Sequence, residues 1–157
     1  DRVPKHTSPD INRRISREIE ERLAYFQSHP EDIDNRLKEL DEEWDIERTI
    51  EANASTLALS GLLLGLTTNR KWLGLPVVVT GFLLQHAIQG WCPPVPILRR
   101  LGFRTADEIN QERYALKALR GDFDRAAAAS PPDRLASILS VIGIGRKPVS
   151  AGPAVRH

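Results

Sequence analysis

The sequence predicts an all-α protein: a transmembrane helical hairpin with amphipathic cytoplasmic helices before and after it. Two stretches without charge, 52–69 and 72–98, each reach the roughly 18 residues that mark a candidate membrane span. Apolar residues on either side of them recur at intervals of three and four, as on one face of a helix. Charge is also segregated, because residues 1–50 hold nine Lys/Arg against fourteen Asp/Glu and the rest of the chain is basic.

Residues 1–50 are expected to form an acidic arm of two amphipathic helices. Ser8 and Pro9 are typical of a helix start, and His29 ends that helix because a residue before proline avoids the helical region. A second helix begins near Pro30. The two apolar stripes consist of Ile11, Ile15, Ile19, Leu23 and Phe26, then Ile33, Leu37, Leu40 and Trp44. We expect the stripes to cover each other; the alternative is that they dock against the helices of a partner.

Residues 51–104 are expected to form the two-helix transmembrane hairpin with its Cys-Pro exit. Small residues permit close helix packing, and the set predicted to do so is Ala54, Ala58, Gly61, Gly65 and Gly81. Tryptophans mark the membrane interfaces, as aromatic belts do, and these are Trp44, Trp72 and Trp91. The alternative, a buried hairpin in a soluble protein, is disfavoured because the flanking chain has too little apolar surface to cover it.

Polar residues gather at one end of the two spans, and the predicted intramembrane cluster is Asn53, Gln85, His86, Gln89 and Cys92. We expect hydrogen bonds across the hairpin to join them to Ser55, Thr56 and Ser60. The alternative is a functional His86, because an ionisable side chain within a membrane is costly. It would then relay a proton or activate Cys92, although the two residues are six apart and would need a second protomer to meet.

The segment after the second span is basic and partly apolar. Arg99, Arg100 and Arg104 alternate with apolar residues there, which predicts lipid-interface anchors that meet anionic headgroups. The distribution of Lys/Arg around the spans favours a cytoplasmic location for both termini. A free cysteine at position 92 agrees with that reducing compartment.

The chain after the hairpin is expected to contain one well-defined helix. Thr105 and Glu108 match a capping box, so a cytoplasmic helix is predicted over 105–121, with Gly121 as its cap. Residues 122–157 are predicted to be a linker and a largely disordered tail, with one short amphipathic turn or two around 135–142.

The hairpin and its exit resemble the YgaP-like inner-membrane domain family, a bacterial group of mostly unassigned function. The matching residues are Gly90, Cys92, Pro93, Leu101, Gly102 and Thr105, within roughly 53–105. The resemblance implies a two-helix membrane module in the bacterial inner membrane, which some members fuse to a rhodanese-type sulfurtransferase domain. No segment of this chain supplies such an α/β domain, so the resemblance does not extend to sulfur chemistry.

These features favour a small integral inner-membrane protein of non-enzymatic role, which self-associates or serves as an accessory or scaffold subunit. Its expected partners are membrane lipids and either copies of itself or a larger membrane-protein complex. Two alternatives are a sulfur-transfer accessory that uses Cys92 and a minimal pore built from several hairpins. No catalytic residue, cofactor, metal site or nucleic-acid contact is predicted, because the histidines are scattered, the acidic residues crowd onto exposed helix faces and the basic tail is sparse.

Overall fold

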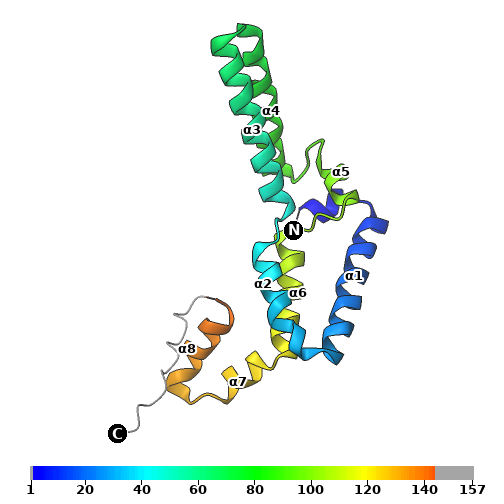
Figure 1. Cartoon of the computed structure of the whole chain (residues 1–157), viewed down its shortest axis with the longest axis vertical. Helices are drawn as coiled ribbons and strands as arrows, with labels where there is room; N and C mark the ends of the chain where they lie inside the picture. The colour runs from blue at the N-terminus through cyan, green and yellow to red at the C-terminus, as the bar shows by residue number, and fades with distance from the viewer. Residues whose placement is uncertain (1, 144–157) are drawn as a thin grey trace.

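The computed structural model describes residues 2–143, and every regular element in that range is helical (Figure 1). The predicted all-α class is therefore confirmed. Three short 3-10 turns are η1 (Val3–His6), η2 (Pro30–Asp32) and η3 (Arg70–Leu73). The α-helices are α1 (Pro9–Ser28), α2 (Ile33–Glu42), α3 (Ile46–Thr67), α4 (Gly74–Gln89), α5 (Val95–Arg100), α6 (Ala106–Leu119), α7 (Asp122–Ala128) and α8 (Pro131–Val141).

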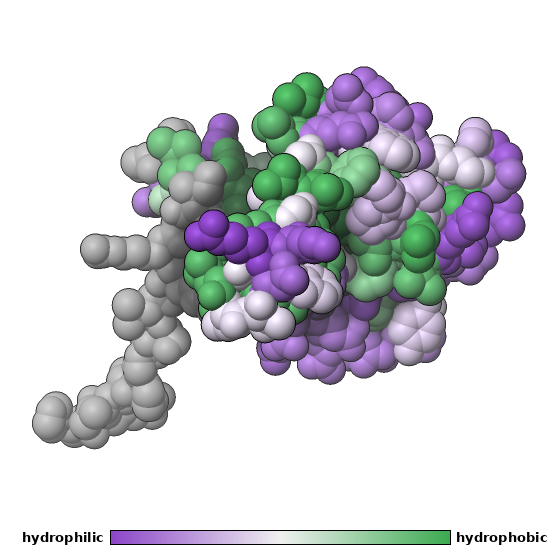
Figure 2. Space-filling model, turned by 90° about the horizontal axis from the view of Figure 1, so that it is seen from above, coloured by the Kyte–Doolittle hydropathy of each residue, from purple (hydrophilic) through white to green (hydrophobic). Residues whose placement is uncertain are grey.

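The helices α3 and α4 lie side by side and project from the rest of the molecule, with η3 at their tip (Figure 1). By length and composition, the two helical stretches that contain them, Pro30–Thr67 and Arg70–Gln89, are long and apolar enough to cross a membrane. Only 22% and 6% of the residues in their apolar windows are buried within the chain, so most of their apolar side chains face outward. Seen from above, apolar residues lie next to the polar surface of the other helices (Figure 2).

Two glycines allow α3 to approach the start of α4. A Cβ added to Gly61 would lie 2.6 Å from Cδ of Pro76, and one added to Gly65 would collide with the side chain of Leu73. Ala54 and Ala58 are half-buried on the same helix. Gly81 differs, because a Cβ there would meet no described atom within 4 Å. The small-residue face of α3 is thus used inside the hairpin, and Gly81 takes no part in that contact.

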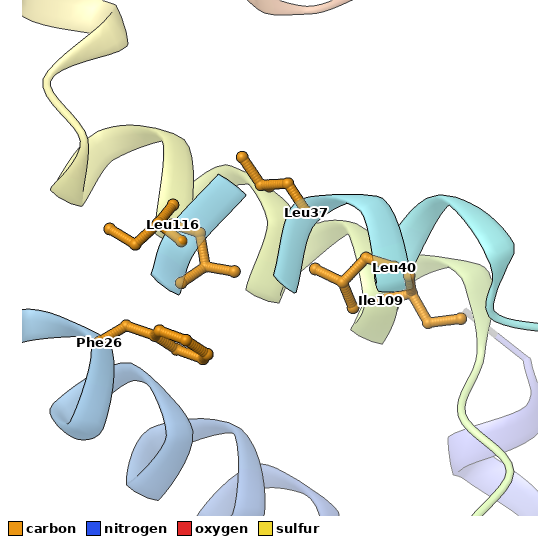
Figure 3. Packing of buried hydrophobic residues seen from close by; sticks show 6 residues of the cluster. Phe26, Leu37, Leu40, Ile109 and Leu116 are labelled. Atoms are coloured by element: carbon orange, nitrogen blue, oxygen red, sulfur yellow. The ribbon is translucent and has the colours of Figure 1, made fainter. Parts of the chain in front are cut away.

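The polar part of the molecule has its core between α1, α2 and α6. Buried side chains from the three helices converge there, among them Phe26, Leu37, Leu40, Ile109 and Leu116 (Figure 3). Ile33 belongs to the same cluster, and the partly buried Leu23 packs against it. The sequence suggested that the two N-terminal stripes cover each other, but in the structure a third helix takes part. The apolar face of α6 packs against both of them, because two narrow stripes on short helices leave a face that a third helix can bury.

A second core joins this polar part to the base of the hairpin. It is formed by the buried residues Val3, Ile46, Ile50, Cys92 and Val95, with Leu83, Leu98 and Phe103 packed against them. The backbone N–H of Ile46 donates to the carbonyl of Arg104 at 2.9 Å, and the Asp45 side chain caps α3 by accepting from the N–H of Arg48 at 2.7 Å. The first turn of α3 is therefore held by the segment that follows the hairpin.

The C-terminal part contains more helix than the sequence suggested. The helix expected within 105–121 is present as α6 (Ala106–Leu119): its capping box is complete, and Gly121 follows its last turn with a left-handed φ of 79°. The segment predicted to be a linker forms α7, and the short amphipathic turn expected around 135–142 is part of a longer helix, α8, which packs against α7. Beyond Gly143, the predicted disordered tail lies outside the described residues.

Candidate functional site

The predicted polar cluster is divided between the two sides of the hairpin. Asn53 and Cys92 line one cavity, while His86 lines a different one. Gln85 donates to Gln89 at 3.5 Å on the same helix. Among the described residues, the hydrogen bonds of this cluster are local instead of crossing the hairpin as expected: the amide of Asn53, for example, donates to the carbonyl of Thr49 at 2.8 Å. Side chains of Asn and Thr readily bond the carbonyl one turn earlier on their own helix.

His86 lies at the base of the hairpin beside charged residues. It is 7% exposed, and its Nδ1 has no hydrogen-bond partner among the described residues. The cavity that it lines has a volume of about 550 Å³. The other lining residues are Arg2, Glu47, Glu51, Ser55, Leu83 and Ala87. This cavity therefore combines one guanidinium, two carboxylates and a buried imidazole.

Arg2 is held in place by the end of α4. Its guanidinium donates to the carbonyls of Ala87 and Ile88, the latter at 3.4 Å. Gly90, with a φ of 74°, lies against the Cβ of Arg2, where any side chain on residue 90 would collide. A cation at the C-terminal end of a helix satisfies free carbonyls and complements the helix dipole. The first described residue is in this way fixed beside the cavity.

Cys92 lies beyond α4 in an apolar environment. It is 2% exposed and lines a cavity of about 330 Å³ whose other walls are mainly aliphatic and aromatic, among them Ile50, Phe82 and Leu98. Burial raises the pKa of the Cys92 thiol, which the backbone N–H of Val95 only partly offsets. Because the thiolate is the nucleophile, this environment lowers the reactivity of the thiol.

The arginines after the hairpin are not three equivalent lipid anchors. Arg100 is exposed, whereas Arg99 is 0% and Arg104 is 4% exposed. Arg99 makes a two-pronged ion pair with Glu108 at 2.7 and 2.8 Å and also donates to Asn12 at 2.9 Å. The expectation that Arg99 and Arg104 meet lipid is thus corrected, because their guanidinium groups are buried against protein.

Glu112 on α6 is the centre of a buried charge network. Its side chain is 0% exposed and accepts from Arg36 at 2.8 Å, from Arg22 at 3.2 Å and from Arg104. Arg104 also donates to Glu43 at 2.7 Å. Burial by itself would raise the pKa of Glu112, but the arginine hydrogen bonds outweigh it and lower that pKa to about 2. The network ties α1, α2 and α6 to the segment that follows the hairpin.

Glu108, at the start of α6, binds both Arg99 and the capping residue Thr105. It accepts from the backbone N–H of Thr105 at 2.8 Å, and its own N–H donates to the Thr105 hydroxyl at 3.3 Å. Burial acts to raise the pKa of Glu108, yet the Arg99 and Thr105 hydrogen bonds hold it below its ordinary value. One carboxylate thus serves both the helix cap and the buried arginine.

The predicted interface tryptophans lie at different positions along the hairpin. Trp44 precedes α3 and is 47% exposed, with the guanidinium carbon of Arg48 4.3 Å from its ring centre. Trp72 lies at the opposite end, in η3, and is 46% exposed. Trp91 is half-buried just after α4. Trp44 and Trp72 therefore bracket the apolar length of α3, as interface residues would.

No family model matches the chain, and no curated protein or solved structure is significantly similar to it. The resemblance to the YgaP-like family remains a prediction that depends on the residues alone.

Sequence reasoning missed the residues that surround His86. Glu51 is the only charged residue between Arg48 and Arg70, and Glu47 lies one helical turn before it. That spacing places both carboxylates on one helix face at the start of a span. It could have indicated an acidic face at this end of the hairpin. The approach of Arg2 had no such signal, since it depends on how the first residues fold back to the hairpin.

Proposed function

We propose that this chain is a small integral protein of the bacterial inner membrane with a non-enzymatic role, an accessory or scaffold subunit of a membrane complex. The observation that supports this most is the outward-facing apolar surface of α3 and α4. An apolar helix pair that the chain does not bury requires either lipid or another protein around it. Membrane lipids and a protein partner are therefore the proposed surroundings of the hairpin.

The polar helices would stand at the cytoplasmic surface as one unit with the hairpin. Ile46, Cys92 and Val95 form part of the shared core at the junction, so the polar part is not tethered by a loose linker. Such an arrangement suits a scaffold, because a partner that binds the polar helices is held at a fixed distance from the membrane.

The surface for association differs from the one the sequence suggested. Gly61 and Gly65 are occupied by contacts inside the hairpin, so they are not available to a second copy. The outward faces of both helices are open, and the one on α4 also offers a small residue, because Gly81 has no close neighbour in the described chain. Self-association or contact with a partner subunit is proposed to use α4.

Membrane insertion and topology can be tested with single cysteines in a Cys92→Ser background. If both termini are cytoplasmic, Thr68→Cys at the hairpin tip reacts with a membrane-impermeant maleimide in intact cells stripped of their outer membrane. Ser8→Cys reacts only after the cells are opened. A chain that is released from membranes by alkaline carbonate, or a Ser8→Cys that labels from outside, contradicts the proposal.

The accessory role can be tested by native mass spectrometry of protein extracted gently from its own membrane. We expect a complex larger than one chain, which Gly81→Leu weakens while the membrane-embedded monomer persists. A monomer in every detergent and at every concentration would contradict a role in association.

Sulfur transfer through Cys92 is the weaker candidate, because the thiol is buried and its pKa is raised. A pore built from several hairpins stays a prediction, for which liposome flux above that of empty vesicles is the test.

A further inference from the structure

The cavity beside His86 lies where the apolar hairpin meets the first charged residues. Glu47 and Glu51 come from the start of α3, and His86 and Ala87 from the end of α4. Glu51 is followed by 18 uncharged residues. If α3 and α4 span the membrane, as proposed above, this cavity lies at the depth of the lipid headgroups.

The charges on its walls have opposite signs and form no direct ion pair with each other among the described residues. No ion pair joins Arg2 to Glu47 or Glu51 among the described residues, and neither carboxylate has another ion-pair partner there. One nitrogen of the Arg2 guanidinium donates to the carbonyls of Ala87 and Ile88. The group has five N–H donors, so the others can bind another acceptor. The cavity thus offers a site for an anion and, across from it, a site for a cation.

His86 contributes a buried imidazole, with a ring nitrogen unpartnered within the described chain, to the wall of this cavity. Its Nδ1 is buried without a partner among the described residues, although buried polar atoms in folded proteins are nearly always paired. The His86 residue itself lines the cavity, next to the charged residues on its walls. The volume of about 550 Å³ falls within the range of ordinary ligand sites.

We propose that this cavity binds the headgroup of a phospholipid with a primary ammonium group, as in phosphatidylethanolamine. The phosphate lies at Arg2, which recognises phosphate oxygens through paired N–H donors, and the ammonium lies between Glu47 and Glu51. An anionic lipid without an amine would meet two unpaired carboxylates. A choline headgroup would reach the same place without any N–H to donate.

This inference depends on the proposed membrane insertion, so the first measurement separates the two. The full chain is reconstituted into vesicles of phosphatidylethanolamine and phosphatidylglycerol, and flotation reports whether it inserts. Failure to float overturns the proposed function. The protein is then extracted from vesicles that contain equal amounts of the ethanolamine and choline lipids, and native mass spectrometry measures which lipid stays bound.

We expect about tenfold more retained ethanolamine lipid than choline lipid, since loss of a hydrogen bond to a charged group typically has an effect of that size. Glu47→Gln/Glu51→Gln removes this preference. The matched control Glu20→Gln/Glu42→Gln removes the same charge from exposed positions away from the cavity and keeps it. Arg2→Ala weakens retention of both lipids, because both carry the phosphate.

The same experiment identifies the source of the headgroup. Soluble glycerophosphoethanolamine is added to the detergent-purified protein, and circular dichroism confirms that each variant keeps its helix content. Retained ethanolamine lipid without binding of the soluble headgroup assigns the site to the membrane lipid. Equal retention of both lipids by the inserted protein, an unchanged preference in Glu47→Gln/Glu51→Gln, or binding of the soluble headgroup alone overturns the proposal.

Discussion

Replacement of Glu112 by glutamine tests the buried charge network most directly. The substitution would keep the shape of the side chain but leave Arg22, Arg36 and Arg104 without their shared carboxylate. Arg104 is nearly inaccessible and Arg36 is 18% exposed, so water replaces the lost partner poorly at Arg104 and only in part at Arg36. Removal of one partner from a buried ion pair typically costs about 3–5 kcal/mol. We expect a loss of that size in the free energy of unfolding of the polar helices.

The pH dependence supplies a second route to the same magnitude. The folded-state pKa of Glu112 lies below its ordinary value of 4.5, at about 2, so its contribution is present above pH 4.5 and is lost as the pH falls towards 2. A depression of this size corresponds to about 3 kcal/mol of stabilisation at neutral pH. The wild-type chain should therefore lose more stability than Glu112→Gln over that pH window.

Urea denaturation of the full chain in mild detergent, followed by far-UV circular dichroism at pH 7 and near pH 3, measures both quantities. Glu39→Gln is the matched control, because Glu39 also pairs with Arg36 at 2.8 Å but is 65% exposed; we expect it to change stability by about 0.5 kcal/mol or less. A loss of under about 1 kcal/mol in Glu112→Gln at pH 7, or equal pH dependence in both proteins, would refute the reasoning.

Three further predictions concern the hairpin, the thiol and the caps. Gly65→Leu should destabilise the hairpin by about 1–3 kcal/mol through overpacking against η3, whereas Gly81→Leu should leave the hairpin itself intact. The helix content that remains in denaturing detergent measures the difference between the two variants. Equal effects would contradict the packing described. Cys92 should react with a maleimide much more slowly in the folded chain than in urea, because it is buried and its pKa is raised; equal rates would contradict this. Thr105→Ala should cost about 1 kcal/mol by loss of its cap, and Ser8→Ala less, because the Ser8 side chain makes no capping bond; thermal unfolding distinguishes them, and the reverse order would argue against the capping box.

Much of the fold was predictable because its local signals are strong. The start of α1 after Ser8, the capping box at Thr105 and the uncharged lengths of the two apolar helices all follow from short-range rules. The glycine face of α3 was also recognised as a packing face. Its partner turned out to be η3 and α4 of the same chain, which spacing on one helix cannot specify.

The long-range pairing could not be predicted in the same way. A stripe such as Ile33, Leu37 and Leu40 states that one face is buried, but it does not state against which helix. The packing of α6 against both α1 and α2 depends on where the chain returns after the hairpin. The prediction that Arg99 and Arg104 contact lipid was wrong for a related reason. The sequence after a span looks the same whether a basic residue there meets lipid phosphate or a carboxylate elsewhere in the chain.

Arg104 shows how the hairpin and the polar helices are coupled. Its carbonyl accepts the N–H of Ile46 at the start of α3, while its guanidinium binds Glu43 before that helix and Glu112 on α6. A shift of α6 relative to α2 therefore has to move Arg104, and with it the backbone that holds the first turn of α3. Because that turn carries Glu47, Arg104 connects α6 to the wall of the cavity beside His86 through a continuous set of hydrogen bonds and backbone contacts.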